Sequence, residues 1–171
     1  MEPEYLILGD LILNISIKLI FALILGAIIG LERSLSGKQA GIRTFSLISL
    51  GSALFMILSN TIIPLSYSEA SFDPTRTLGQ IIVGLGFLAG GLVFFKEKEN
   101  KISGLTTAAA VWVSAAIGAA VGLGAYLTAI ITTFLVFFVL DILFRIEKKF
   151  NLSEDEAIKR KLNFKEEETK E

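Results

Sequence analysis

Three charged side chains lie close together between two long apolar runs: Glu32, Arg33 and Arg43. Charge at the edge of hydrocarbon is costly, so a carboxylate beside two guanidinium groups is expected to form a fixed ion pair. Glu32 ends the first run and Arg43 opens the second, which also makes a pair across the hinge plausible. Thr44 adds a hydroxyl next to Arg43. A simpler interpretation makes these residues anchors whose stems pass through the headgroups.

A second polar group is expected at the start of a later helix, in Gly104-Leu105-Thr106-Thr107. The first turn of a helix has unpaired backbone donors, which favour a polar or anionic partner. Hydrogen bonding of Thr106 within the bundle is the simpler alternative. Gln80 shares a helix face with Gly84, so we expect its amide to point into the bundle. The complete candidate cluster is Glu32, Arg33, Arg43, Thr44, Gln80, Gly104, Thr106 and Thr107.

Four further residues are weaker candidates: Asp73, Arg76, Trp112 and Asp141. Asp73 precedes a proline, which favours a role as helix N-cap over cation binding. Trp112 is more typical of packing or of an interface anchor. Asp141 is an ionisable residue inside an apolar run, as is Lys18, which we expect to snorkel outward. These two lie near opposite membrane faces and cannot pair.

The chain contains no cysteine and no histidine. This excludes thiol nucleophiles, disulfides and imidazole ligands. Asp73 with Glu69 falls far short of an oxygen cage for a divalent cation. The sequence therefore predicts no catalytic residues, no metal site, no cofactor and no enzyme.

The elements that position these residues are membrane helices. Of the 171 residues, 53% are hydrophobic and only 19% are charged, too few for a soluble domain. Spans of about 20 apolar residues predict an all-α, polytopic protein with five transmembrane helices. They are expected near residues 8–31, 42–64, 78–95, 105–121 and 124–144. The uncharged run 102–140 must turn back, with Gly118 to Gly124 as the expected turn and a tight helix hairpin around it.

Residues 1–145 are thus expected to form one transmembrane domain, followed by a short charged cytoplasmic tail at 146–171. A weak amphipathic helix at 153–164 and disorder are about equally favoured there. Lysine and arginine gather in alternate loops, whereas the opposite side has only Arg76. The positive-inside rule then places the N-terminus outside and the C-terminus in the cytoplasm.

Small or polar residues recur at every fourth position in two of these helices. The first series is Asn14, Lys18, Ala22, Gly26, Gly30 and Ser34, and the second is Thr106, Ala110, Ser114, Gly118 and Gly122. Residues four apart form a ridge, and small side chains on it let helix backbones approach closely in lipid. Both series are predicted to be packing seams.

Taken together, the motifs resemble the MgtC/SapB family of bacterial inner-membrane proteins over about residues 10 to 145. The likeness rests on Gly30 to Arg33, Ala40 to Thr44, Asp73 to Arg76 with Gln80, Gly84 to Gly91, and Gly104 to Ala109 leading to Trp112. Ala89-Gly90 departs from the usual order of glycine then alanine, a swap that preserves close packing. The resemblance implies a multi-pass protein of the inner membrane with a role in growth at low magnesium and, in pathogens, in survival inside host cells.

Longer members of that family continue into a folded cytoplasmic domain, for which residues 146–171 are too short. The resemblance also implies regulation of other membrane machinery, notably the proton-translocating ATP synthase. We therefore favour a non-enzymatic regulator whose partners are the lipid bilayer, a membrane protein such as ATP synthase, and further copies of the chain, with no nucleic acid. The alternative is a small oligomeric transporter or channel for an ion or small solute.

Overall fold

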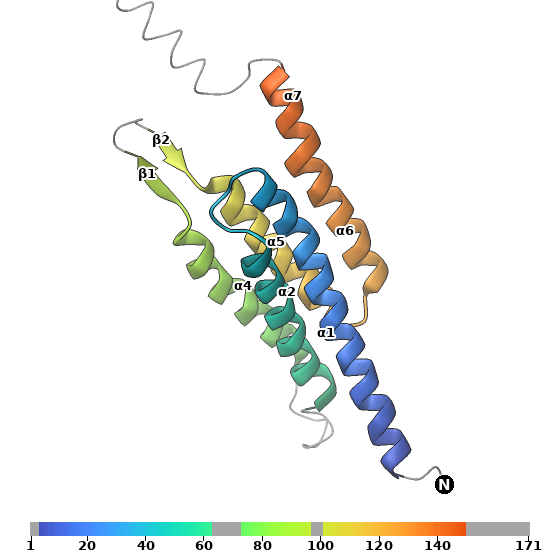
Figure 1. Ribbon diagram of the computed structural model, residues 1–171. Helices are drawn as coiled ribbons and strands as arrows, with labels where there is room; N and C mark the ends of the chain where they lie inside the picture. The colour runs from blue at the N-terminus through green and yellow to red at the C-terminus, as the bar shows by residue number, and fades with distance from the viewer. Residues whose placement is uncertain (1–3, 63–72, 97–100, 150–171) are drawn as a thin grey trace, which may run out of the picture. The chain divides into compact units, whose positions relative to one another are not determined.

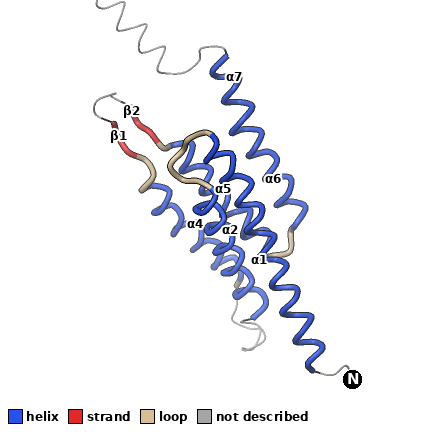
Figure 2. The backbone as a smooth tube through the Cα atoms, in the orientation of Figure 1, coloured by secondary structure: helices blue, strands red, loops and turns tan. Residues whose placement is uncertain are grey.

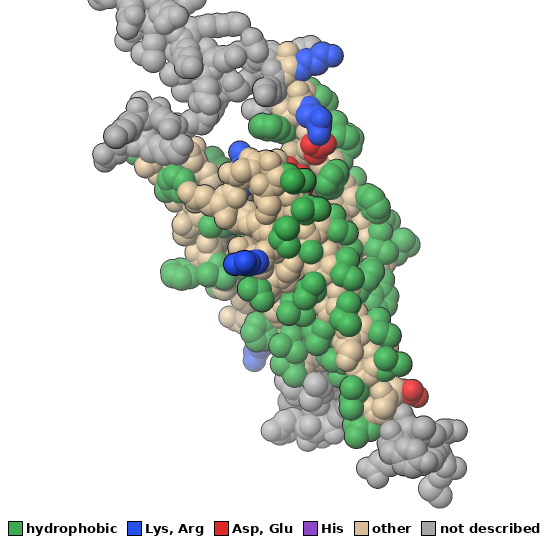
Figure 3. Space-filling view, viewed as in Figure 1, with side chains coloured by type: hydrophobic (Ala, Val, Ile, Leu, Met, Phe, Trp, Pro, Cys, Tyr) green, Lys and Arg blue, Asp and Glu red, His purple; other side chains and the backbone are tan. Residues whose placement is uncertain are grey.

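The computed structural model describes residues 4–62, 73–96 and 101–149, and most of them are helical (Figures 1 and 2). Within these described ranges, four helical stretches are long and apolar enough to cross a bilayer: Leu8–Leu35, Ile42–Asn60, Leu105–Gly122 and Tyr126–Ile146. Apolar side chains cover most of the face drawn in Figure 3. The chain is therefore a multi-pass membrane protein. It divides into two compact units, Met1–Val136 and Phe137–Glu171, which are described separately.

Helix α1 is the longest element, with 32 residues from Glu4 to Leu35. At about 1.5 Å per residue it is about 48 Å long, and its N-terminal part extends beyond the other helices of the first unit (Figure 1). It exceeds the expected span 8–31 at both ends. Helix α2 covers Ile42–Ile57 and continues as a π-helical segment, η1, at Leu58–Ile62. The expected end of this span, residues 63 and 64, lies outside the described residues.

Helix α4 covers 17 residues, Pro74–Gly90, and occupies the place of the expected third span. The predicted range 78–95 is wrong at both ends. At the start, the chain is already helical at Pro74, because Asp73 caps the helix. At the end, Gly91 is the C-cap, and a run rich in β-branched and aromatic residues follows. Phe94–Lys96 forms strand β1, which pairs antiparallel with β2, Lys101–Ser103.

The β-hairpin corrects the all-α prediction locally, since residues 94 and 95 were expected to be helical. Phe94 pairs with Ser103 and Phe95 with Ile102, so the two strands bring the end of α4 back to the start of α5. Helix α5 covers Leu105–Gly122 and α6 covers Tyr126–Phe138. Gly118 and Gly122 remain helical, so the turn occupies only the end of the expected range, where Gly124 has φ +84°.

Helices α1, α2 and α5 form the core of the first unit by close backbone contact. A Cβ atom at Gly26 would lie 2.5 Å from the carbonyl oxygen of Phe45, and one at Gly30 would lie 2.6 Å from Cα of Ile42. From α5, a Cβ at Gly118 would overlap the carbonyl oxygen of Ser49. The glycines of the predicted packing seams are thus confirmed as positions where α1 and α5 pack closely against α2.

Two serine hydroxyls reinforce this core across the helices. Ser49 Oγ donates to the carbonyl oxygen of Ala22 at 2.7 Å, and Ser114 Oγ donates to that of Phe45 at 3.3 Å. All four residues are buried. Interhelical hydrogen bonds of this kind add to dispersion where lipid supplies no hydrophobic drive for association.

Helices α4 and α6 complete the first unit. Helix α4 packs mainly on α5, and Phe21 of α1 meets Tyr126 of α6 edge to face with ring centroids 5.7 Å apart. After its turn, α6 diverges from α5, so the tight helix hairpin expected there is wrong beyond the turn itself.

The second unit contains the end of the last span. It comprises the π-helical segment η4, Val139–Leu143, and helix α7, Phe144–Lys149. The helix expected at 153–164 and the rest of the tail lie outside the described residues.

Candidate functional site at the hinge

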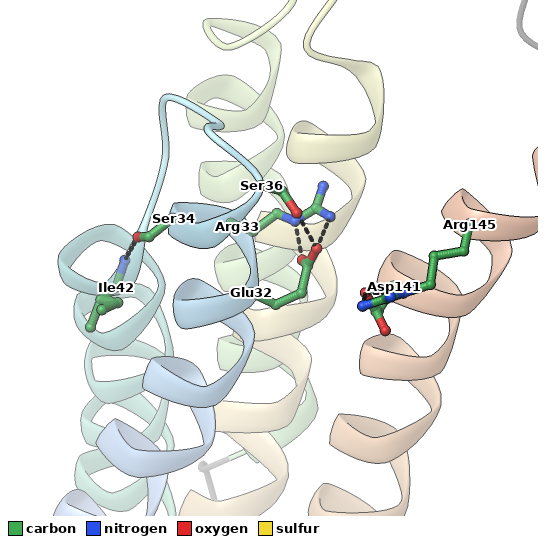
Figure 4. Close-up of polar contacts among 7 residues, drawn as sticks. All are labelled: Glu32, Arg33, Ser34, Ser36, Ile42, Asp141 and Arg145. Atoms are coloured by element: carbon green, nitrogen blue, oxygen red, sulfur yellow. Dashed lines mark hydrogen bonds and ion pairs between the residues drawn. The ribbon is translucent and has the colours of Figure 1, made fainter. Parts of the chain in front are cut away.

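The hinge between α1 and α2 holds a buried ion pair. Arg33 donates from Nε to Oε2 of Glu32 and from Nη2 to Oε1 at 2.6 Å, and Ser36 Oγ donates to the same Oε1 at 2.8 Å (Figure 4). Glu32 and Arg33 are only 6% and 3% exposed. A bidentate pair of this kind holds both side chains in one geometry, and the serine satisfies a further lone pair of the carboxylate.

The start of α2 is fixed from the end of α1. The backbone N–H of Ile42 donates to Ser34 Oγ at 3.2 Å, because the N-cap residue, Gly41, has no side chain with which to cap its own helix (Figure 4). The backbone of Ile42 also lies directly against Gly30 of α1, where a side chain would not fit. Ser34 therefore serves as a cap supplied from across the hinge.

Arg43 and Thr44 do not join the ion pair. Both are exposed, and among the described residues Arg43 has neither an ion pair nor a side-chain hydrogen bond. The pair across the hinge considered from the sequence, Glu32 with Arg43, is therefore wrong, and Glu32 pairs with its neighbour Arg33. Ile42 is held against Gly30, which directs the next residue away from α1.

The second predicted motif begins α5. Gly104 is its N-cap with φ +95°, and a Cβ there would overlap the carbonyl oxygen of Leu92. Thr107 is buried, whereas Thr106 is exposed. The predicted seam therefore loses its first member, and Thr107 faces the bundle in its place, next along the chain.

Gln80 and Trp112 line two different grooves. Gln80 was expected to point into the bundle; it is exposed and lines an open groove between α2 and α4. Trp112 is 46% exposed and lines a groove of about 230 Å³ between α4 and α5. It is exposed, whereas Ala110, Ser114 and Gly118 of the seam of α5 are buried.

Of the three remaining weaker candidates, Asp73 and Asp141 form local side-chain contacts. Asp73 Oδ1 accepts hydrogen bonds from the backbone N–H of Thr75 at 2.9 Å and from its hydroxyl at 2.6 Å, which confirms the N-cap. These bonds hold the pKa of Asp73 below its usual value. Arg76 is exposed in the first turn of the same helix. In the second unit, Asp141 Oδ1 pairs with Arg145 Nη2 at 2.9 Å (Figure 4).

Lys18 has a role that the sequence reasoning missed. Its Nζ donates to the carbonyl oxygen of Gly122 at 3.2 Å, a contact between α1 and α5 that the expectation of snorkelling did not include. The ammonium group lies at the C-terminal end of α5, where unpaired carbonyls and the helix dipole favour a cation. The signal was present, since Lys18 belongs to the small-residue series of α1 and Gly122 to that of α5.

Within the described ranges, no buried side-chain nitrogen or oxygen lacks a hydrogen-bond partner, and no group of three acidic residues could hold a metal ion. A model of the MgtC family matches residues 19–149, most of the chain. The chain belongs to the MgtC family. The match includes the hinge, both grooves and the start of α5.

Several curated relatives of this MgtC-family chain are similar over its membrane part. It is 46% identical over 104 residues to the Escherichia coli K12 protein named "Putative magnesium transporter YhiD", covering 60% of this chain and 47% of that protein. Protein SrpB of Synechococcus elongatus is 38% identical over 117 residues, 62% of each chain. Protein MgtC of Brucella abortus is 41% identical over 97 residues, 57% of this chain and 37% of that one.

The matched part of this MgtC-family chain spans about half the length of YhiD and 62% of SrpB. No solved structure matches it. The site thus consists of a buried, bidentate ion pair at the hinge, next to a core in which the backbones of α1, α2 and α5 are in close contact. Chemically, it holds a fixed charge pair in place and leaves the second arginine of the hinge, Arg43, and two grooves at the surface.

Proposed function

We propose that this chain is a non-enzymatic regulator in the bacterial inner membrane that acts in magnesium homeostasis through contacts with another membrane protein. The observation that carries the proposal is the construction of the core. Glycines of α1 and α5 bring both helices against the backbone of α2, and no fully enclosed side-chain nitrogen or oxygen of the described residues lacks a hydrogen-bond partner. Such a core supports a rigid scaffold that presents its outer surfaces to a partner.

The placement of the predicted polar cluster supports the same proposal. Glu32, Arg33 and Thr107 are buried, while Arg43 and Gln80 are exposed. The predicted cluster is thus divided between the interior of the first unit and its surface. Family membership and the names of its relatives connect the chain with magnesium.

The partner that we propose is the proton-translocating ATP synthase. The experiment measures ATP-driven proton pumping in inverted membrane vesicles prepared with graded amounts of the protein. We expect the pumping rate to change with the amount of protein, and to do so less with a variant whose hinge is disrupted, Glu32→Gln. A rate that stays constant over a wide range of expression would contradict this choice of partner.

A transporter is the second candidate, and the name of YhiD favours it. The groove between α2 and α4 carries Gln80, Thr77 and Ser52, polar groups that a second copy could close into a path. Sustained flux of an ion or small anion through the purified protein, abolished by Arg43→Ala, would favour this candidate over the regulator.

A further inference from the structure

The groove between α2 and α4 has a volume of about 590 Å³, against about 230 Å³ for the groove between α4 and α5. Its walls are mainly aliphatic and aromatic. The lining residues are Leu47, Ile48, Ser52, Phe55, Thr77, Gln80, Ile81, Gly84, Leu85 and Leu88. In a multi-pass membrane protein, an apolar hollow between two helices that is open at its side has to be filled by an apolar chain from the bilayer or from a partner.

One end of this groove is closed by a hydrogen bond. Ser59 Oγ, in the π-helical segment after α2, donates to Thr77 Oγ1 in α4 at 2.8 Å. Ser59 is buried and Thr77 lines the groove. The bond ties α2 to α4 at the end where α2 finishes and α4 starts. The opposite end, toward Leu47 and Leu88, has no such bond among the described residues.

Arg43 lies at that opposite end. It precedes Leu47 by four residues, and helix positions four apart share a face, so Arg43 continues the α2 wall of the groove by one turn. It is exposed, no described residue forms an ion pair with it, and the first turn of α2 contains no acidic residue. Arg33, only ten residues earlier, is buried and paired with Glu32. Arg43 is thus a cation at the mouth of an apolar groove.

We propose that this groove binds one acyl chain of an anionic phospholipid, with the lipid phosphate held by Arg43. A guanidinium group pairs with phosphate through two parallel hydrogen bonds, and the acyl chain fills the hollow between α2 and α4. This site goes beyond the proposed regulatory function and does not depend on it.

The charge at the mouth favours a lipid over a second copy of the chain. A symmetric dimer formed through this groove would place the same surface on itself and so bring two Arg43 side chains into one interface. Like charges that face each other at close range are unfavourable, whereas an anionic headgroup removes the unpaired charge.

Gly84 offers a sharp test, because it lines the groove and a Cβ there would meet nothing within 4 Å. Gly84→Leu therefore puts an apolar side chain into the groove from a position whose Cβ has open space, and it raises helix propensity. Gly86→Leu is the matched control: Gly86 lies on the same helix and is also open, but it does not line the groove. Arg43→Gln removes the charge at the mouth, and Arg76→Gln removes an exposed arginine at the start of α4.

The experiment is native mass spectrometry of the full chain, released from detergent after mixing with phosphatidylglycerol or with phosphatidylcholine of the same acyl chains. Inorganic phosphate alone is the third probe. We expect one phosphatidylglycerol to be retained in preference to phosphatidylcholine, and phosphate alone not to bind. Arg43→Gln should reduce that preference by about fivefold, the effect of one basic side chain near a membrane surface, whereas Arg76→Gln should not.

Gly84→Leu should lose the retained lipid, whereas Gly86→Leu should keep it. Equal retention of the two lipids by the unmodified chain, or retention by Gly84→Leu equal to that by Gly86→Leu, would overturn the proposal. A lipid-free dimer that Gly84→Leu dissociates would overturn it as well, in favour of a second copy. The comparison of lipids on the unmodified chain decides the matter even if a variant fails to fold.

Discussion

The Glu32–Arg33 pair stabilises the hinge only while both partners are present. Two buried charges that hydrogen-bond to each other offset their desolvation, whereas one charge left behind does not. Ser36 and the close packing of α1 on α2 keep the pair in place.

Glu32→Gln should therefore destabilise the protein strongly. The amide retains the size of the side chain but removes the charge that balances Arg33, a loss of about 3–5 kcal/mol when buried pairs are broken. Thermal unfolding in detergent measures the effect. Asp141→Asn is the matched control: its partner, Arg145, is 75% exposed, and exposed pairs contribute about 0–1 kcal/mol. Equal losses of stability for the two variants would show that the hinge pair is not special.

Gly104 requires glycine for two reasons. Its left-handed backbone conformation disfavours a side chain, and its surroundings leave no room for one. A left-handed conformation alone costs a non-glycine residue roughly 1–2 kcal/mol. Gly104→Ala should lower the free energy of unfolding by more than this, because its Cβ also overlaps the carbonyl oxygen of Leu92. Gly37→Ala provides the comparison, because Gly37 has φ +66° but open space around it. If denaturation shows that the two variants lose the same free energy of unfolding, the overlap with Leu92 does not contribute to stability.

The sequence located these residues but not their partners. Whether Glu32 pairs with Arg33 or with Arg43 depends on where α2 starts relative to α1. The position of the start of α2 along α1 is set by the contact of Gly30 with Ile42 and by the hydrogen bond from Ile42 to Ser34. Residue spacing in the sequence does not predict either contact. The hydroxyls of Thr106 and Thr107 could not be told apart either, since a rotation of α5 by one residue exchanges them.

Among the elements, the glycine seams were the most predictable feature. A four-residue repeat of small residues predicts close helix contact in lipid, and both seams grip α2. The β-hairpin was missed because Phe94 and Phe95 extend the apolar run of α4, and hydropathy alone does not distinguish a helix from a short strand. Gly90-Gly91 was the available signal for the end of the helix.

Gly118→Ala should separate α2 from α5. A methyl group at this position overlaps the backbone of Ser49, which cannot move without shifting the whole helix. We expect a clear loss in melting temperature and in folded yield. Gly86→Ala in α4 meets nothing within 4 Å and should be neutral or slightly stabilising. If Gly118→Ala keeps the melting temperature and the folded yield of the unmodified chain, α5 does not pack against Ser49 closely enough to exclude a methyl group.

For the molecule as a whole, the distribution of basic residues predicts that the hinge faces the cytoplasm. Single cysteines can test this directly, because the chain has none of its own. A membrane-impermeant thiol reagent added to intact spheroplasts should label Ala70→Cys, whereas Lys38→Cys should be labelled only after the membrane is opened. The reverse pattern would overturn the orientation and place the lipid site in the other leaflet.

The regulator proposal depends on whether the compact core conducts anything. The direct measurement is the flux of Mg²⁺, protons and small anions into liposomes that contain the purified full chain, compared with protein-free liposomes. Because glycine contacts bring α1 and α5 against α2, we predict no flux above the protein-free background. Sustained flux that Arg43→Ala abolishes would contradict the regulator and establish transport.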